Sequence, residues 1–177
     1  MGRGTDMQIR KETARDCPAI SRLIAEAFLS AQHSTGREAD IVIGMRAAGA
    51  LALSLVAEEE GRIVGHIAIS EARVGEEAGW FLVGPLAVLP AWQGRGIGSA
   101  LMKAAIEELK TGEAGGQSLG FVLVGYPDYY GRFGFRSFAG LTVAGVPAEN
   151  VMGLPFGTRE PMGELIHHPA FGLDQKE

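Results

Sequence analysis

A glycine-rich turn between an apolar segment and a helical segment carries the clearest chemistry in this sequence. Residues 81–89 form an apolar run typical of a buried strand, and Pro90 ends it. In residues 93–98, every second position from Gly94 is glycine. From Gly98 onward, apolar residues recur on one stripe of a predicted helix: Leu101, Met102, Ala105 and Leu109. Because the first N–H groups of a helix lack partners and glycines let a phosphate approach them, this arrangement predicts an anion site.

Three kinds of phosphate site compete for this turn. A P-loop needs Lys-Ser or Lys-Thr after its last glycine, which this sequence lacks. The dinucleotide motif G-x-G-x-x-G would begin at Gly94 and Gly96, but Ser99 replaces its third glycine. The third pattern, Gln/Arg-x-x-Gly-x-Gly/Ala, is matched by Gln93, Gly96 and Gly98. A glycine-rich turn that binds no ligand is the structural alternative.

With this third pattern the sequence resembles the GNAT superfamily of N-acetyltransferases. Residues 84–88 and 129–135 are most similar to a bacterial branch of predicted acetyltransferases within that superfamily. In that family the loop holds the pyrophosphate of acetyl-CoA. The resemblance therefore implies acetyl-CoA as the cosubstrate. It implies that the pyrophosphate binds the main chain of Gln93, Gly94, Arg95, Gly96, Ile97, Gly98 and Ser99.

Gly84-Pro85 inside the apolar segment is a second informative feature. Proline has no N–H to give to a sheet, so one edge of this strand must be unpaired, bulged or splayed. An unpaired edge beside an anion site can bind an extended ligand as though it were another strand. The resemblance places the pantetheine arm of CoA there, against Leu86, Ala87 and Val88. A bulge that only bends the sheet is the alternative.

The segment Tyr130-x-x-Phe133-Gly134-Phe135 resembles the second GNAT signature, in which a short helix carries a tyrosine. The matching tyrosine is commonly the general acid that protonates the departing CoA thiolate. The spacing selects Tyr130 rather than its neighbour Tyr129. A phenol suits this role, because it is a neutral donor at pH 7 and can hydrogen-bond to sulfur as charge develops. The alternative is a packed tyrosine whose hydroxyl caps a backbone group.

The remaining periodicities predict the elements that must position these residues. Asp16 and Pro18 mark the start of the first helix, and Glu60-Gly61 marks a tight turn. We expect helices over 17–30, 38–48 and from 98, and strands over 7–12, 53–59, 62–71, 80–89, 119–124, 135–146 and 164–167. The strand over 135–146 is expected to have a kink near Gly140. Residues 147–163 are expected to be mostly loop. The resemblance implies an α/β (α+β) fold: a mixed, mostly antiparallel sheet that is splayed at its central strands and flanked by helices.

Length and composition bound the class of protein. At 177 residues and 18.7 kDa the chain fits one domain over 1–177. The resemblance covers a core of about 7–138 and leaves 139–177 as a C-terminal extension. A formal net charge of −5 argues against nonspecific nucleic-acid binding, which needs clustered Lys and Arg. The sequence has no apolar run long enough for a membrane span, and its one cysteine, Cys17, suits a reducing compartment, so we expect a cytoplasmic protein.

Four other features were weighed for chemistry. We expect Cys17 to be a buried or half-buried small residue rather than a reactive thiol, and His66 to be a hydrogen-bonded structural histidine. The acidic run 58–60 is expected to be a solvated strand end. His167 and His168 would face opposite sides of a strand, and no carboxylate or cysteine completes a ligand set, so no metal is assigned.

The expected activity is transfer of an acetyl group from acetyl-CoA to an amine by direct attack. Many relatives place a glutamate on the central strand as general base, but residues 81–83 are apolar here. Glu71, His66, an acid of the second helix or solvent would then take the proton. The acceptor, a small-molecule or peptide amine, stays open among polyamines, aminoglycoside-like sugars, amino acids and protein N-termini. A CoA-binding regulatory module without transfer activity is the alternative function, and the resemblance implies that homodimers can form.

Overall fold

The computed structural model describes residues 6–29, 31, 34–112 and 118–169. Its helices are α1 (Cys17–Phe28), α2 (Glu38–Ala47), α3 (Ile97–Thr111) and α4 (Pro127–Tyr130). Its strands are β1 (Gln8–Lys11), β2 (Leu51–Glu59), β3 (Arg62–Val74), β4 (Glu77–Val88), β5 (Gly120–Val124), β6 (Arg136–Ser137), β7 (Leu141–Thr142), β8 (Val151–Pro155) and β9 (Gly163–Ile166).

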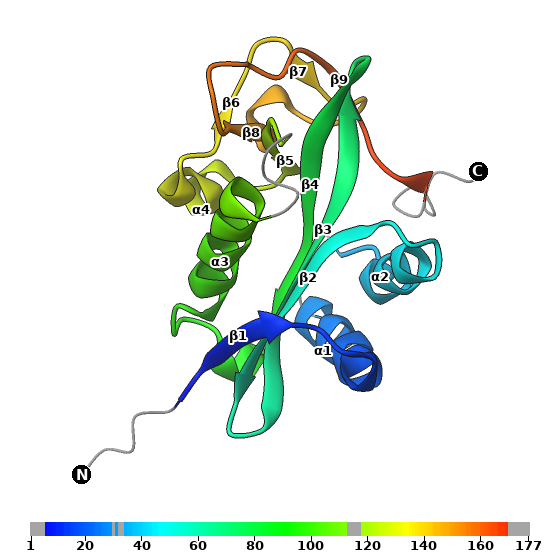
Figure 1. Ribbon diagram of the computed structural model, residues 1–177, viewed down its shortest axis with the longest axis vertical. Coiled ribbons are helices and arrows are strands. Elements are labelled where there is room, and N and C mark those ends of the chain that lie inside the picture. Colours follow the sequence, from blue (N-terminus) through cyan, green and yellow to red (C-terminus); the bar gives the residue numbers. More distant parts are fainter. Residues whose placement is uncertain (1–5, 30, 32–33, 113–117, 170–177) are drawn as a thin grey trace.

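The strands form one sheet in the order β1-β2-β3-β4-β5-β8-β6, and β9 pairs with β3 and with β7. Neighbours along this path are antiparallel except for β4 and β5, which are parallel. Helices α3 and α4 lie on one side of the sheet, and α1 and α2 lie on the other (Figure 1). The predicted fold class, a mixed and mostly antiparallel sheet flanked by helices, is confirmed.

The two central strands separate after a short paired stretch. Strands β4 and β5 pair only from Trp80–Gly120 to Leu82–Val122 within the described residues. Further along β4, its register with β3 shifts between the pairs Ile69–Val83 and Ile67–Leu86. Gly84 and Pro85 together therefore stand opposite one β3 residue, which is the bulge that the proline predicted. The second half of β4 is left with an edge that β5 does not cover.

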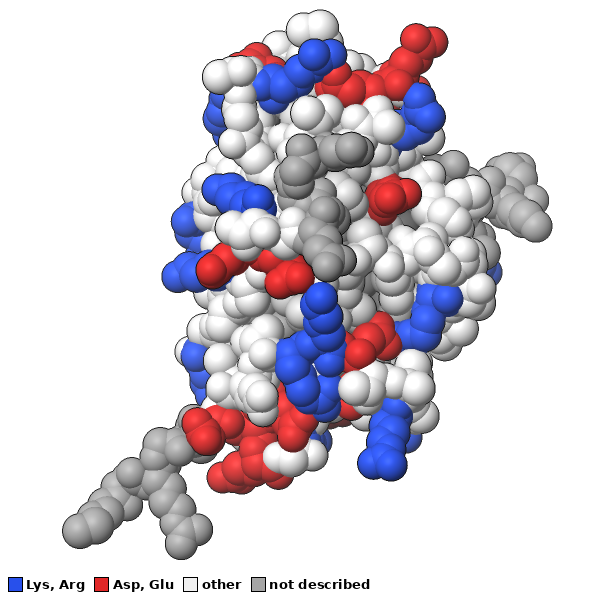
Figure 2. Space-filling model, viewed as in Figure 1, with Lys and Arg blue, Asp and Glu red and all other residues white. Residues whose placement is uncertain are grey.

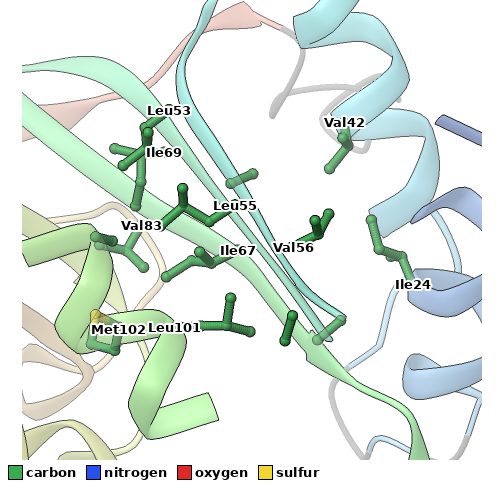
Figure 3. Close-up of a cluster of buried hydrophobic side chains, with 14 of the residues drawn as sticks. Ile24, Val42, Leu53, Leu55, Val56, Ile67, Ile69, Val83, Leu101 and Met102 are labelled. Atoms are coloured by element: carbon green, nitrogen blue, oxygen red, sulfur yellow. The ribbon is translucent and has the colours of Figure 1, made fainter. Parts of the chain in front are cut away.

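The core occupies both faces of the sheet. In Figure 3, Leu101 and Met102 of α3 lie toward the β-sheet side chains on one face, while Val56 faces Ile24 and Val42 on the other. The face toward α3 is made by Leu53, Leu55, Ile67, Ile69 and Val83. The predicted stripe of α3 is buried throughout, from Leu101 to Leu109. Helix α3 approaches the sheet closely over Gly65, where a Cβ would lie 2.9 Å from side-chain carbons of Ile97 and Leu101.

The C-terminal segment differs from its prediction. The predicted strand over 135–146 is wrong in its extent, because only the short strands β6 and β7 form there, but the turn that separates them lies at the predicted kink near Gly140. The predicted loop over 147–163 is also wrong in part, since it contains β8, which pairs with β5. The sequence does not predict β8 because glycine, here Gly153, has low strand propensity. In the fold Gly153 lies close to the Phe138 ring, which a Cβ at this position would meet at 3.1 Å. The segment buries a second cluster made by Trp80, Leu82, Val122, Phe138, Leu141, Val151 and Leu165.

The N-terminal strand is attached through a cluster of charges. The guanidinium of Arg10 pairs with Asp16 at 2.8 Å and with Glu58 at 2.7 Å. The Asp16 carboxylate also accepts the Thr13 N–H at 2.6 Å, so it caps the 3₁₀ turn Ala14–Asp16 rather than α1 as predicted. Hydrogen bonds from Arg10 hold the pKa of Asp16 well below its usual range. The acidic run is therefore not simply solvated: Glu58 is paired, and Glu59 is buried.

The surface mixes charges of both signs. In Figure 2, Lys and Arg lie beside Asp and Glu over most of the face, while acidic side chains gather at the lower end. Among the described helices, none combines the length and the apolar character needed to cross a bilayer. The described residues also include no group of three His, Cys, Asp or Glu side chains placed to hold a metal ion.

Candidate functional site

The predicted phosphate turn opens into a cavity of about 350 Å³ at the N-terminus of α3. The predicted site residues that line it are Leu86, Val88, Gln93, Gly94, Gly96, Ile97, Gly98, Ser99 and Tyr130. Trp92, Tyr129 and Arg132 complete the lining. We call this space the cofactor cavity.

Two predicted residues do not line the cofactor cavity. Ala87 is buried and stands opposite His66, and because side chains alternate along a strand it faces away from Leu86 and Val88. The Arg95 side chain turns toward solvent and lies over the Trp92 ring, 4.7 Å from its centroid. Only the main chain of Arg95 stays available for the predicted role.

The backbone conformation of the turn explains why glycine occupies two of its three glycine positions. Gly94 and Gly96 have φ of +77° and +81°, and a Cβ at either position would meet nothing within 4 Å. Glycine is therefore required by conformation and not by space. Left-handed residues that alternate with ordinary ones turn successive N–H groups toward one anion. Among the described residues, the N–H groups of 94–99 have no protein acceptor, and the first bond that closes the helix runs from the Ala100 N–H to the Gly96 carbonyl at 3.0 Å.

Gln93 plays a different part from its neighbours. Its main-chain N–H already donates to the Pro90 carbonyl at 3.3 Å. Its side-chain amide donates to the Val88 carbonyl at 3.1 Å. Gln93 therefore ties the turn to the end of β4, and the unpaired donors begin at Gly94.

The third glycine of the turn makes room for a tyrosine. A Cβ on Gly98 would lie 2.6 Å from the hydroxyl oxygen of Tyr129, whereas the next ring atom would be 3.8 Å away. The Tyr129 ring meets the Tyr130 ring edge-on at 4.9 Å, and the Arg132 guanidinium covers its face at 4.6 Å. Sequence reasoning missed Tyr129, although its position beside Tyr130 and two residues after a proline was visible. Its hydroxyl links α3 to α4 across the cofactor cavity.

Tyr130 is held by aromatic and backbone contacts. Its ring packs 5.9 Å from that of Phe135, and a Cβ on Gly125 would lie 2.4 Å from its Cε2 atom. Gly125 therefore creates the space that the ring occupies. Burial raises the pKa of Tyr130 to about 12, with a smaller contribution from Tyr129, so the phenol stays neutral at physiological pH.

Tyr130 also borders a second, larger cavity of about 820 Å³. We call it the acceptor cavity. Four separate stretches of chain line it: Phe28 and Ala31 at the end of α1, Val124 to Tyr126 at the end of β5, Tyr130, and Val146, Pro147 and Asn150 before β8. Among the residues that line the two cavities, Tyr130 is the one that both share. No motif could have predicted this wall, because its residues come together only in the fold.

The candidate general bases lie elsewhere. His66 is fully buried, its Nε2 is 2.8 Å from the Ser54 hydroxyl, and burial lowers its pKa to about 3. This confirms a structural histidine. Glu71 borders a different cavity beside Phe81, and the Glu38 carboxylate accepts the Thr35 N–H at 2.8 Å. The described residues that line the cofactor and acceptor cavities include no carboxylate and no histidine.

Comparison with known proteins agrees with this geometry. The acetyltransferase (GNAT) domain model matches residues 51–137. Over 132 residues the chain is 36% identical to the uncharacterized N-acetyltransferase YhbS of Escherichia coli K12. The matched region covers 73% of this chain and 74% of YhbS.

Solved structures resemble the whole chain. A GNAT family acetyltransferase from Brucella melitensis in complex with acetyl-CoA matches with a TM-score of 0.81 and 39% identity, over 94% of this chain and 99% of that one. YhbS from E. coli in complex with CoA matches with a TM-score of 0.86 and 26% identity, over 97% and 95% of the two chains. Sequence and fold agree, and the chain belongs to the GNAT family of acetyltransferases.

Proposed function

We propose that this acyltransferase moves the acetyl group of acetyl-CoA to an amine by direct attack, with Tyr130 as the general acid. The diphosphate of acetyl-CoA lies on the N–H groups of Gly94 to Ser99, and its pantetheine arm lies beside Leu86 and Val88. The observation that carries this proposal is the place of Tyr130 between the cofactor and acceptor cavities. The relatives solved with acetyl-CoA and CoA support the choice of ligand.

The chemical step needs one donor at the departing sulfur. The amine nitrogen forms a C–N bond to the thioester carbonyl carbon, and the C–S bond then breaks. The thiolate receives its proton from the Tyr130 hydroxyl, which is neutral because burial keeps its pKa near 12. The proton released by the nitrogen passes to solvent, and solvent returns a proton to the phenolate. The products are an N-acetylated amine and CoA with a free thiol.

The rest of the rate comes from holding the reactants together. Neither cavity presents a carboxylate or a histidine among its described residues, so the amine arrives after losing its proton to water. Fixing the amine against the thioester supplies several kcal/mol of the barrier reduction. Main-chain N–H groups on the uncovered edge of β4 would stabilise the developing charge on the thioester oxygen. We also propose that the protein acts in the cytoplasm, where its single cysteine, Cys17, would stay reduced.

The test is the Tyr130→Phe variant, assayed for CoA thiol release with a panel of amines and for acetyl-CoA affinity by calorimetry. Loss of the general acid should lower kcat by about 100-fold or more, and the acetyl-CoA Kd should change by less than about threefold. An unchanged kcat would reject the role of Tyr130. Tight binding of acetyl-CoA by the unmodified protein without thiol release would favour the CoA-binding module instead.

A further inference from the structure

The acceptor cavity has a wall of distinct chemistry. Val124 and Tyr126, at the end of β5, are 48% and 55% exposed although both are large and apolar or aromatic. Phe28 and Val146 face the same space. Exposed apolar side chains that gather around a cavity usually mark a ligand site. The half-buried Tyr130 also lines this cavity, so the proposed function places the cavity next to the reacting thioester.

Among the described residues of this wall, the polar side chains are few and include no Lys, Arg, His, Asp or Glu. The Asn150 side-chain amide donates to the Gly125 carbonyl at 3.0 Å, so it braces the end of β5. The other polar side chains of this wall are the phenols of Tyr126 and Tyr130, and burial raises the pKa of the Tyr130 phenol to about 12. A ligand that carries a second charge into this cavity would lose hydration and gain no opposite charge from these side chains.

From this wall we infer the class of acceptor: a primary amine whose remaining body is uncharged and apolar, such as an alkyl or aryl chain. This rests on the proposed function and narrows it, because it places polyamines and aminoglycoside-like sugars outside the preferred class. The apolar body lies against Phe28, Val124 and Val146, and its nitrogen points toward Tyr130. The volume of about 820 Å³ accommodates a body of several carbons.

A matched pair of amines tests the inference. Hexylamine and cadaverine have the same length and the same reacting group, but cadaverine has an ammonium group where hexylamine has its terminal methyl group. The unmodified protein with acetyl-CoA should show a kcat/KM at least about tenfold higher for hexylamine. Equal values, or a preference for cadaverine, would overturn the inference and leave the proposed function intact. Transfer to neither amine nor to any other amine of the panel would overturn both.

A charge placed in the wall should reverse the preference. Val124→Asp puts a carboxylate in the acceptor cavity and should raise kcat/KM for cadaverine relative to hexylamine by about tenfold or more. Ile166→Asp is the matched control, because Ile166 is also a strand residue and is 49% exposed, but it borders another cavity. The control should keep the preference for hexylamine. If Val124→Asp folds and leaves the ratio of the two amines unchanged, the wall does not select the acceptor and the inference is wrong.

Discussion

The two cavities that meet at Tyr130 are built in different ways. The cofactor cavity is formed mainly by one continuous stretch, from the end of β4 through the turn to the first residues of α3. Its polar groups include main-chain N–H groups without a protein acceptor among the described residues, in a turn whose conformation requires glycine. The acceptor cavity is formed by side chains from four stretches that lie as much as 122 residues apart, from Phe28 to Asn150.

This difference explains which substitutions the cofactor cavity and the acceptor cavity can each tolerate. In the proposed function the main-chain site binds a group common to every reaction, the diphosphate of the cosubstrate, and such a site tolerates little change in backbone conformation. A site built from side chains can change its selectivity through single substitutions such as those at Val124. We expect damage on the cofactor side to weaken acetyl-CoA binding, and damage on the acceptor side to lower turnover or change the acceptor.

The largest effect is expected where the acceptor side supports the general acid. In Gly125→Ala the new Cβ would lie 2.4 Å from the Tyr130 ring, so the ring must move. Because a misplacement of about 1 Å can cost about 100-fold, kcat should fall by that order while acetyl-CoA affinity changes little. Steady-state kinetics and calorimetry on the same preparation measure both. A variant that keeps its thermal stability and its full kcat would contradict the claim that Gly125 positions the Tyr130 ring.

A double-mutant cycle tests the cofactor side. Gly98→Ala would place a Cβ 2.6 Å from the Tyr129 hydroxyl, and overpacking of about 1–3 kcal/mol should weaken acetyl-CoA binding by about tenfold or more. In a Tyr129→Phe background the ring atom nearest to the new Cβ is 3.8 Å away, so Gly98→Ala should weaken acetyl-CoA binding by less than about threefold.

Gly96→Ala is the control for this cycle. Alanine at position 96 should lose about 1–2 kcal/mol of conformational free energy, because φ there is +81°. The loss should be the same with Tyr129 and with Tyr129→Phe. If Gly98→Ala weakens acetyl-CoA binding equally with and without the Tyr129 hydroxyl, then Gly98 serves the backbone alone and the contact with Tyr129 has no consequence.

The smallest effect on activity is expected from a substitution in the charge cluster before α1. Helix α1 ends at Phe28, which lines the acceptor cavity. Asp16→Asn should lower the free energy of unfolding by about 1–3 kcal/mol at pH 7 and leave the acetyl-CoA Kd unchanged. The folded-state pKa of Asp16 lies below its unfolded value, so its stabilisation is present above about pH 4 and is lost as pH falls further. Urea denaturation across pH should show the two proteins converging in acid. A constant difference at every pH would contradict this account.

The sequence predicted the cofactor side better than the acceptor side for a physical reason. The turn at 93–98 encodes its conformation locally, because Gly94 and Gly96 stand where φ is positive. The bulge at Gly84-Pro85 was equally local, since proline removes a donor wherever it stands. By contrast, β8 was missed because Gly153 and Pro155 lower strand propensity, and pairing with β5 overrides that propensity only in the fold.

Some residues of the turn were predicted for a reason that the structure refines. The motif attributes Gly98 to the approach of a phosphate, yet a Cβ at this position would first meet the Tyr129 hydroxyl. The main-chain N–H of Gln93 was counted among the donors, yet it is bonded to Pro90. Tertiary contacts of this kind carry no signal in the order of residue types, so the motif predicted residues that line one cavity without assigning each residue its part.

The most direct test of the central claim is a crystal structure of the protein with CoA. We expect the diphosphate oxygens within hydrogen-bond distance of the N–H groups of Gly94 to Ser99, and the CoA sulfur beside the Tyr130 hydroxyl. Density for CoA in another cavity, or a diphosphate that does not contact this turn, would contradict the account.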